Sequence, residues 1–191
     1  MGVKINAKKL QNNFLHARKQ SFLHPRSFAS EDVKNQEVLN SMTTTKKIYL
    51  GSDHNGFKLK EKLKLWLEKK AIVYEDKGDL SFDQQDDYPD YAEKVARAVV
   101  RNNSFGVLLC GSAQGVCIAA NKVKGARAVV PTTLKEVRLS RNDDNANVLC
   151  LSGWFMHFHQ ATRLIEKFIS TPFSEKPRHK RRLAKIRRME R

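Results

Sequence analysis

Cysteine is scarce in this sequence, long apolar stretches are missing, and the first thirty residues contain no acid. The three cysteines Cys110, Cys117 and Cys150 are odd in number and form no C-x-x-C pair, which argues against a disulfide framework and against a zinc site. We therefore expect three reduced thiols and no bound metal. No run of about 18 apolar residues occurs, so no bilayer-spanning segment is expected, and no secretory leader is recognisable. These absences predict a cytoplasmic protein.

The excess of basic residues lies at the two ends of the chain. Of the formal net charge of +16, residues 1–30 carry +6, and residues 175–191 carry +7. The 144 residues between them hold only the remaining +3. A nearly neutral body with basic ends is typical of an enzyme with basic appendages, whereas a domain that follows a phosphate backbone carries its charge on the body. We therefore do not expect nucleic acid to be the partner.

Residues 1–46 precede the first regular pattern of apolar residues. They lack a sustained apolar period and are dominated by His, Asn, Gln, Ser and Lys, which predicts a basic, flexible N-terminal extension. The first thirty residues also have the acid-free, serine-containing composition of an organelle transit peptide. Import into an organelle therefore stays open, and so does the use of Met42 as the working start.

From residue 47 onward, short apolar stretches alternate with segments of helical period. The expected strands are residues 47–51, 71–74, 106–110, 126–130 and 147–151, and the expected helices are residues 57–70, 91–100, 116–122, 134–142 and 159–169. This alternation predicts an α/β fold with a parallel sheet of about five strands, covered by helices on both faces. Ligands bind at the carboxyl ends of such strands, where two glycine-containing loops follow at residues 51–56 and 111–115.

A cysteine stands at the end of the most apolar expected strand. Cys110 precedes the loop 111–115, which opens a helix whose free N–H groups and dipole favour negative charge. We expect a lowered thiol pKa there. A thiolate can take a proton from a carbon beside a carbonyl, while the loop N–H groups stabilise the enediolate oxygen that results. The alternative is a buried, unreactive cysteine, which is the expected state of Cys117 and Cys150.

An acid and an imidazole lie in the first of these loops. Asp53 and His54 directly follow the first expected strand, and they lie beside the loop after Cys110 if the two strands are neighbours. Both side chains can then exchange protons with substrate hydroxyl groups. The alternative is a structural role, in which Asp53 caps the next helix and His54 faces solvent.

The basic C-terminal tail places two arginines one helical turn apart. Arg178 and Arg182 are separated by four residues, so a helix over this tail presents both on one face, with a gap that suits a phosphate. Arginine binds phosphate through two parallel N–H donors. The alternative is a basic face that is merely solvated.

Six short motifs follow one another between residue 47 and the end of the chain. They are Gly51-Ser-Asp-His-Asn-Gly56, Asp87-Tyr-Pro-Asp-Tyr91, Cys110-Gly-Ser112, Ile118-Ala-Ala-Asn-Lys122, Leu139-Ser-Arg141 through Asn147-Val-Leu149, and Arg178-His179. In this order they resemble the motifs of the type B ribose-5-phosphate isomerases, whose wider family includes the galactose-6-phosphate isomerase subunits. The match is collinear and covers about residues 47–191, which we expect to form the isomerase domain with a basic helical tail.

The resemblance implies a Rossmann-like three-layer α/β/α sandwich without metal or other cofactor. It also implies a homodimer or homotetramer whose subunits share their active sites. Cys110 matches the base that moves a proton between the two carbons of an enediolate, and Ser112 matches a residue that holds the anion site of the loop. His54 lines the sugar and is counted with the catalytic residues. The implied substrate-binding residues are Asp53, Tyr88, Gly111, Gly115, Asn121, Asp144, Arg178, His179 and Arg182.

Asp143 is the main departure from the family pattern, because the family commonly has at this position the histidine that opens the furanose ring. A free aspartic acid titrates near ~3.9 and imidazole near ~6.5, so Asp143 is the weaker general acid at neutral pH unless its pKa is perturbed. We expect either that Asp144 raises the pKa of Asp143 by like-charge repulsion or that His54 takes over the proton transfer.

Two further departures lie in and after the loop that follows Cys110. Ala113-Gln114 replaces the usual pair of a glycine and a hydrophobic residue, which adds a polar side chain to the anion loop. Val116 stands where one branch of the family has a glutamate base, so we expect the cysteine mechanism.

Together these features predict an enzyme that interconverts ribose 5-phosphate and ribulose 5-phosphate, a step of the pentose phosphate pathway. Cys110 would act as the base, and the basic tail would hold the phosphate. Two alternatives stay open. One is an isomerase of another sugar phosphate such as a hexose 6-phosphate, and the other is a non-catalytic protein that binds a sugar phosphate or RNA.

Overall fold

The computed structural model describes residues 46–190, and residues 1–45 and 191 lie outside the described part. The chain divides into two units, Met1–Met42 and Thr43–Arg191, and the following paragraphs concern the second. The flexible extension expected for residues 1–46 therefore falls almost wholly outside the described residues and stays a prediction. Between residues 46 and 190, no helix is both long and apolar enough to cross a membrane.

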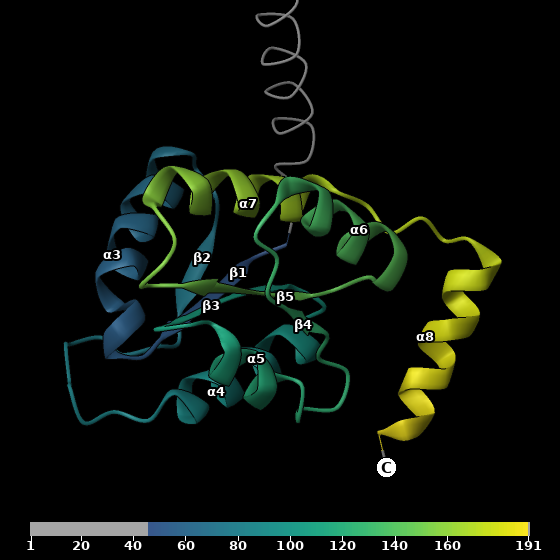
Figure 1. Cartoon of the computed structure of the whole chain (residues 1–191), viewed down its shortest axis with the longest axis horizontal. Coiled ribbons are helices and arrows are strands. Elements are labelled where there is room, and N and C mark those ends of the chain that lie inside the picture. Colours follow the sequence, from purple (N-terminus) through teal and green to yellow (C-terminus); the bar gives the residue numbers. More distant parts are fainter. Residues whose placement is uncertain (1–45, 191) are drawn as a thin grey trace, which may run out of the picture. The chain divides into compact units, whose positions relative to one another are not determined.

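Five parallel strands form one sheet at the centre of this unit (Figure 1). They are β1 (Ile48–Ser52), β2 (Tyr74–Asp76), β3 (Phe105–Cys110), β4 (Ala128–Val129) and β5 (Val148–Ser152), in the order β2-β1-β3-β5-β4. β1, β3 and β5 are buried at every position, as expected of strands that are covered on both faces. The predicted parallel sheet of five strands is confirmed.

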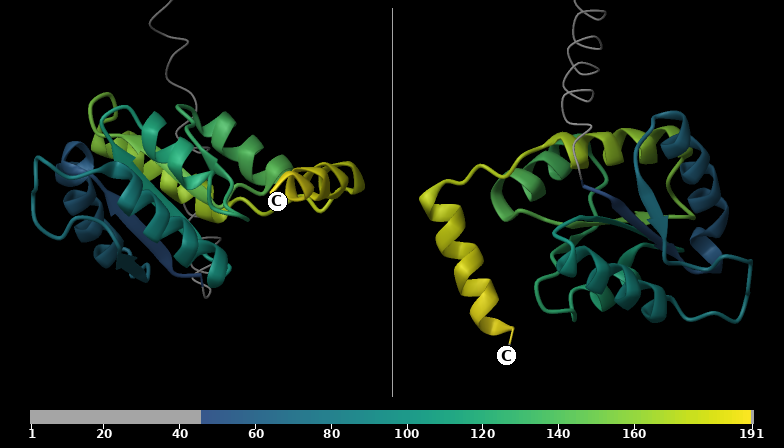
Figure 2. Two further views of the ribbon diagram at one scale, coloured as in Figure 1. Left: turned by 90° about the horizontal axis from the view of Figure 1, so that it is seen from below. Right: turned by 180° about the vertical axis from the view of Figure 1, so that it is seen from behind.

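Helices cover both faces of the sheet, which gives three layers (Figures 1 and 2). One face carries α3 (His54–Lys69), α6 (Leu134–Asp144) and α7 (Phe158–Ser170), and the other carries α4 (Tyr88–Arg101) and α5 (Gln114–Ala120). Each face has its own apolar core, with Leu63 and Phe168 on the first and Val95 and Val116 on the second. The predicted α/β/α sandwich is confirmed. The tail forms the further helix α8 (Pro177–Met189), in which only His179 is buried.

Several helices begin earlier than the apolar spacing predicts, because local capping extends them. α3 begins at His54, since the Asp53 carboxylate accepts a hydrogen bond of 3.0 Å from the Gly56 N–H. This is a standard N-terminal cap. α4 begins at Tyr88 with a proline in its first turn, where the missing N–H costs nothing.

The strand expected at residues 71–74 is wrong in its position, because β2 begins only at Tyr74. Residues 71 and 72 instead complete the end of α3. The Ala71 and Ile72 N–H groups donate to the carbonyls of Glu68 and Leu67 at 3.0 and 2.9 Å, and Ala71 has a φ of 53°. Left-handed residues of this kind satisfy the last carbonyls of a helix.

Gly56→Ala is expected to destabilise the domain by about 1–3 kcal/mol, the usual cost of overpacking a buried contact. A Cβ at residue 56 would lie 2.6–2.8 Å from Leu109, including its backbone carbonyl, so neither side can yield easily. Urea unfolding measures the effect. Lys58→Ala, an exposed change on the same helix, should stay within about 0.5 kcal/mol of the unchanged protein. Equal midpoints for both variants would contradict this account of the α3–β3 contact.

Candidate active site

Pairing between β1, β3 and β5 brings the first candidate residues to one edge of the sheet. Ser52 lies opposite Leu109, and Cys110 lies opposite Ser152. The Asp53 N–H donates to the Leu109 carbonyl at 3.3 Å, and the Ser152 hydroxyl donates to the Gly111 carbonyl at 2.6 Å. The ends of three strands therefore converge at the carboxyl edge, where the topology predicts a site.

Cys110 is a buried free thiol, with only 5% of its surface exposed. Burial raises the pKa of Cys110, and the Asp53 carboxylate raises it further, although the N–H groups of Val116, Ala113 and Ser112 face the sulfur and act in the opposite direction. The expected lowering of the Cys110 pKa is therefore wrong, because desolvation outweighs the backbone donors. Cys117 and Cys150 are also free thiols; Cys150 is buried as expected, whereas Cys117 is only partly buried and its hydrogen bond with Cys150 lowers its pKa.

The loop after Cys110 is tightly covered by two aromatic rings. A Cβ at Gly115 would lie 2.7 Å from the Tyr88 ring, and a Cβ at Gly111 would lie 2.5 Å from the Trp154 ring. The structure therefore brings Tyr88, Gly111 and Gly115 together with Cys110, as expected. Trp154 was not expected here, and it is 62% exposed beside the loop. Ala113 has a φ of 69°, a conformation that glycine adopts without strain.

His54 pairs with a carboxylate that the sequence analysis did not single out. Its Nδ1 lies 2.5 Å from Asp86 Oδ1, and its backbone N–H donates to the same oxygen at 3.1 Å. This hydrogen bond is the first cause that raises the pKa of His54, and Asp53 and Asp83 add to it. The alternative in which His54 faces solvent is therefore wrong. The alternative in which Asp53 caps a helix is confirmed, and burial raises the pKa of its carboxyl group.

The remaining charged candidates gather at the opposite, amino edge of the sheet. Asp143 and Asp144 end α6, and the Asn147 carbonyl that follows accepts from Gly106 near the beginning of β3. Arg178, His179 and Arg182 lie on α8, which stands on the side of the sheet away from the loop between β2 and α4 (Figure 1). The six residues of β3 separate the two edges by about 20 Å. One chain does not bring the two groups together.

Asp143 lies beside His179 rather than beside Cys110. Its Oδ1 is 3.7 Å from the buried His179 Nδ1, which is also 2.7 Å from the Ser174 hydroxyl. A hydrogen bond from Asn142 lowers the pKa of Asp143, and the nearby positive groups lower it further. The expectation that this pKa is raised is wrong, because the Asn142 hydrogen bond and, after it, the positive groups around the end of α6 lower it. Asp143 is thus ionised at neutral pH and is poorly suited to donate a proton.

Asn121 has a structural role at the end of α5. Its side-chain oxygen accepts from the Ala128 N–H at 2.8 Å, and its amide nitrogen donates to the Ala128 carbonyl at 2.9 Å. Both polar atoms therefore hold β4 against α5. The structure does not bring Asn121 to the carboxyl edge, so the expected role in substrate binding is not supported there.

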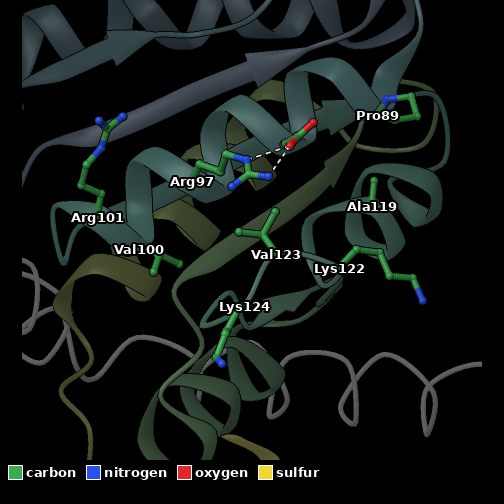
Figure 3. Close-up of a pocket in the computed structure, with 9 residues that line it drawn as sticks. Pro89, Arg97, Val100, Arg101, Ala119, Lys122, Val123 and Lys124 are labelled. Atoms are coloured by element: carbon green, nitrogen blue, oxygen red, sulfur yellow. Dashed lines mark hydrogen bonds and ion pairs between the residues drawn. The ribbon is translucent and has the colours of Figure 1, made fainter. Parts of the chain in front are cut away.

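A cavity of about 910 Å³ lies between α4 and α5 (Figure 3). It is lined by Pro89, Glu93, Arg97, Val100, Arg101, Ala119, Lys122, Val123 and Lys124. Its acidic side chain, Glu93, is held in an ion pair of 2.7 Å with Arg97. The cavity includes no candidate catalytic residue, so we place the chemistry at the Cys110 edge.

Comparison with known proteins connects this geometry to a family. A family model described as Ribose/Galactose Isomerase matches residues 48–186. The chain belongs to this family. The match spans β1 to α8 and therefore includes both edges of the sheet. The resemblance inferred from the six motifs is confirmed.

Individual relatives agree with this assignment. The chain is 43% identical to a probable ribose-5-phosphate isomerase B of Mycoplasma genitalium over 145 residues, which are 75% of this chain and 95% of that protein. The crystal structure of the Mycoplasma genitalium isomerase B with bound ribulose 5-phosphate matches with a TM-score of 0.73 at 41% identity, over 77% of this chain and 97% of that one. The type B isomerase of Trypanosoma cruzi matches with a TM-score of 0.72 at 37% identity, over the same shares.

Alkylation of Cys110 by iodoacetamide is expected to rise with pH along a curve whose midpoint lies above that of an ordinary thiol, about 8.5. The reason is that burial disfavours the thiolate more than the loop N–H groups favour it. Peptide mass spectrometry separates Cys110 from the other two cysteines, and limited access to the sulfur slows the reaction without moving its midpoint. A midpoint below 8.5 would show that the loop donors prevail.

Proposed function

We propose that this chain interconverts ribose 5-phosphate and ribulose 5-phosphate through an enediolate, with the Cys110 thiolate as the base. The observation that carries the proposal is the position of Cys110 at the end of β3. There its sulfur faces three backbone N–H groups and lies close to Asp53, and the neighbouring strand end leads directly into His54. The family membership and the closely related isomerases support the same activity.

The reaction moves one proton between adjacent carbons of the open-chain sugar. The Cys110 thiolate takes the proton from C2, and the electron pair of that bond forms the C1–C2 double bond while negative charge moves to O1. The N–H groups of the loop stabilise this charge. The thiol then returns the proton to C1 while the O2 proton passes to O1, so O1 becomes the C1 hydroxyl and O2 becomes the ketone oxygen. Because a raised thiol pKa limits the thiolate, the rate should increase with pH in the neutral range.

We propose that a second copy of the chain completes each site. The candidate phosphate-binding residues Arg178 and Arg182 lie on α8, at the edge of the sheet opposite to Cys110 of the same chain. Both arginines are exposed, so they can reach the carboxyl edge of a neighbouring subunit. In a two-fold dimer, α8 of each subunit can reach the carboxyl edge of the other subunit. A homodimer is the smallest assembly that meets this requirement, and a tetramer would contain two such pairs.

A thiol base requires a compartment that keeps it reduced. Cys110, Cys117 and Cys150 are free thiols, and free thiols persist where glutathione and thioredoxin act. We therefore propose the cytoplasm as the location, with the phosphorylated sugar and a second copy of the chain as the partners.

Cys110→Ala is expected to lower kcat for ribose 5-phosphate by roughly 10²- to 10⁴-fold, the usual contribution of a general base. A coupled assay that detects ribulose 5-phosphate measures the effect, and Cys117→Ala is the matched control that should keep nearly full activity. Hexose 6-phosphates are assayed in parallel. A higher kcat/KM for one of them than for ribose 5-phosphate would overturn the pentose assignment, and full activity of Cys110→Ala would overturn the role of the thiol.

A mixture of two inactive variants is expected to regain activity. Cys110→Ala damages the carboxyl-edge group, and Arg182→Ala damages the α8 group. If sites are shared, each mixed dimer contains one intact site, so co-expressed chains in equal amounts should reach roughly a quarter of the unchanged activity. Differently tagged chains allow the mixed dimers to be purified and assayed. If they stay as inactive as the two parents, each site is complete within one chain.

A further inference from the structure

Four side chains that follow the carboxyl ends of β1, β2 and β5 form one continuous series of hydrogen bonds. The Trp154 indole Nε1 lies 3.2 Å from Asn55 Oδ1, and Asn55 Nδ2 lies 2.8 Å from His54 Nε2. His54 Nδ1 in turn lies 2.5 Å from Asp86 Oδ1. The four residues come from three segments, namely the end of β5, the start of α3 and the loop between β2 and α4. We name this series the Trp154–Asp86 relay.

The chemistry of the indole group fixes the direction of every hydrogen bond in the relay. An indole N–H can only donate, so the Asn55 oxygen faces Trp154 and the Asn55 NH₂ group faces His54. His54 Nε2 must then accept a hydrogen bond, which leaves the ring proton of the neutral imidazole on Nδ1. That N–H donates to the Asp86 carboxylate. The relay therefore selects one neutral tautomer of His54, with the lone pair on Nε2.

Asp86 is held rigidly in place to receive this hydrogen bond. Its side chain is only 4% exposed, and Oδ1 accepts from both the backbone and the ring of His54. Oδ2 is buried and makes no hydrogen bond within 3.5 Å among the described residues, although the Tyr91 hydroxyl faces the same carboxylate. A buried carboxylate with a free oxygen is costly unless positive charge lies nearby. His54 makes the shortest contact of Asp86, so its ring supplies that charge once Nε2 takes up a proton.

The loop that carries Asp86 is anchored by a buried lysine. Lys60 of α3 is fully buried; its ammonium group donates to the Asp79 carbonyl at 2.7 Å and pairs with Asp76 at the end of β2. The Asp79 carboxylate in turn accepts from the N–H groups of Ser81 and Asp83 at 3.1 and 3.0 Å. The loop is thus fixed to the helix that begins with His54, which keeps Asp86 and His54 in register.

We propose that His54 opens the sugar ring and that Asp86 is its positioning residue. This inference rests on the proposed isomerase activity, and it assigns a step that Asp143, ionised and at the other edge, does not serve within this chain. The sugar displaces the Asn55 NH₂ group from His54 Nε2, and the freed lone pair then takes the proton from the anomeric O1–H as O1 becomes the aldehyde oxygen. The C1–O4 bond breaks, its electron pair goes to O4, and Nε2 returns the proton to O4. No proton is gained or lost, and Asp86 stabilises the imidazolium that exists between the two transfers.

The charged groups around His54 all favour its protonated form. Asp53 faces it from the β1–α3 junction, and Asp86 and Asp83 face it from the loop between β2 and α4; each raises the pKa of His54. Because His54 acts as a base, activity with the cyclic sugar should fall as the pH drops through this raised pKa. Removing the charge of Asp86 should move this acidic fall in activity to lower pH. It should also lower kcat, because no carboxylate then accepts from Nδ1–H or stabilises the imidazolium.

The decisive comparison uses one substrate with a ring and one without. Ribose 5-phosphate cyclises through O4, whereas 4-deoxyribose 5-phosphate lacks O4 and cannot form a ring. Asp86→Asn should lower kcat for ribose 5-phosphate by roughly 10²-fold, shift the acidic limb to lower pH and leave turnover of the 4-deoxy sugar within about twofold. Asp86→Glu should recover part of the loss. Asp90→Asn, an exposed acid in the first turn of α4, is the matched control and should leave both activities unchanged.

Nitrogen-15 NMR of the histidine rings tests the relay without relying on activity. His54, identified by comparison with a His54→Gln sample, should show the neutral Nδ1–H tautomer at high pH, and Asp86→Asn should alter that pattern. The proposal is overturned if His54 carries its proton on Nε2, or if Asp86→Asn slows the cyclic and ring-free sugars equally. If the unchanged enzyme turns over neither sugar but the tautomer is as stated, the proposed function fails while the relay geometry stands.

Discussion

The in-register parallel pairing of β1, β3 and β5 is the constraint on which the site depends. Each strand is fully buried, so a slip by one residue would turn apolar side chains toward the wrong helical layer. The same register places Asp53, Cys110 and Ser152 at one edge. Two glycines permit close packing at this edge. Gly56 lets α3 approach Leu109, and Gly111 lets Trp154 lie over the loop after Cys110. The register of the three strands therefore determines both the packing of the core and the geometry of the site.

Polar contacts of the buried Lys60 hold a segment outside the sheet, namely the loop after β2. Lys60 connects α3 to the end of β2 and to the following loop, and burying a lysine is tolerable only because its donors meet acidic side chains and a carbonyl. The loop would otherwise be the least constrained segment near the site. With Lys60 in place, the loop presents Asp86 to the residue that begins the same helix. In the proposed mechanism, a structural ion pair thus sets the position of a proton-transfer group.

Much of the fold was predictable from the sequence, because buried strands and amphipathic helices leave a strong local pattern. The β2 prediction failed since Ile72 and Val73 look like strand residues, although the chain there closes the end of α3. At the site, Cys110, Asp53 and His54 were found because they directly follow strands. Asp86 and Trp154 were missed because loop side chains have no period, and only tertiary contacts bring them to His54. The pKa of Cys110 was predicted in the wrong direction, because the sequence indicates the helix dipole but not the depth of burial.

In the proposed mechanism, the carboxyl edge of the sheet carries the chemistry and the amino edge carries the residues that bind the phosphate. The carboxyl edge holds a thiol and an imidazole whose carboxylate partner favours proton uptake. At the amino edge, the pKa of Asp143 is lowered, and its carboxylate lies 3.7 Å from the buried His179 on the helix that carries the candidate phosphate-binding arginines. Because the pKa of Asp143 is lowered, the proposed mechanism needs another side chain to carry the ring-opening proton. In the proposed mechanism the acidic residue at position 86 meets this need, because it turns His54 from a residue that lines the sugar into a base of fixed tautomer.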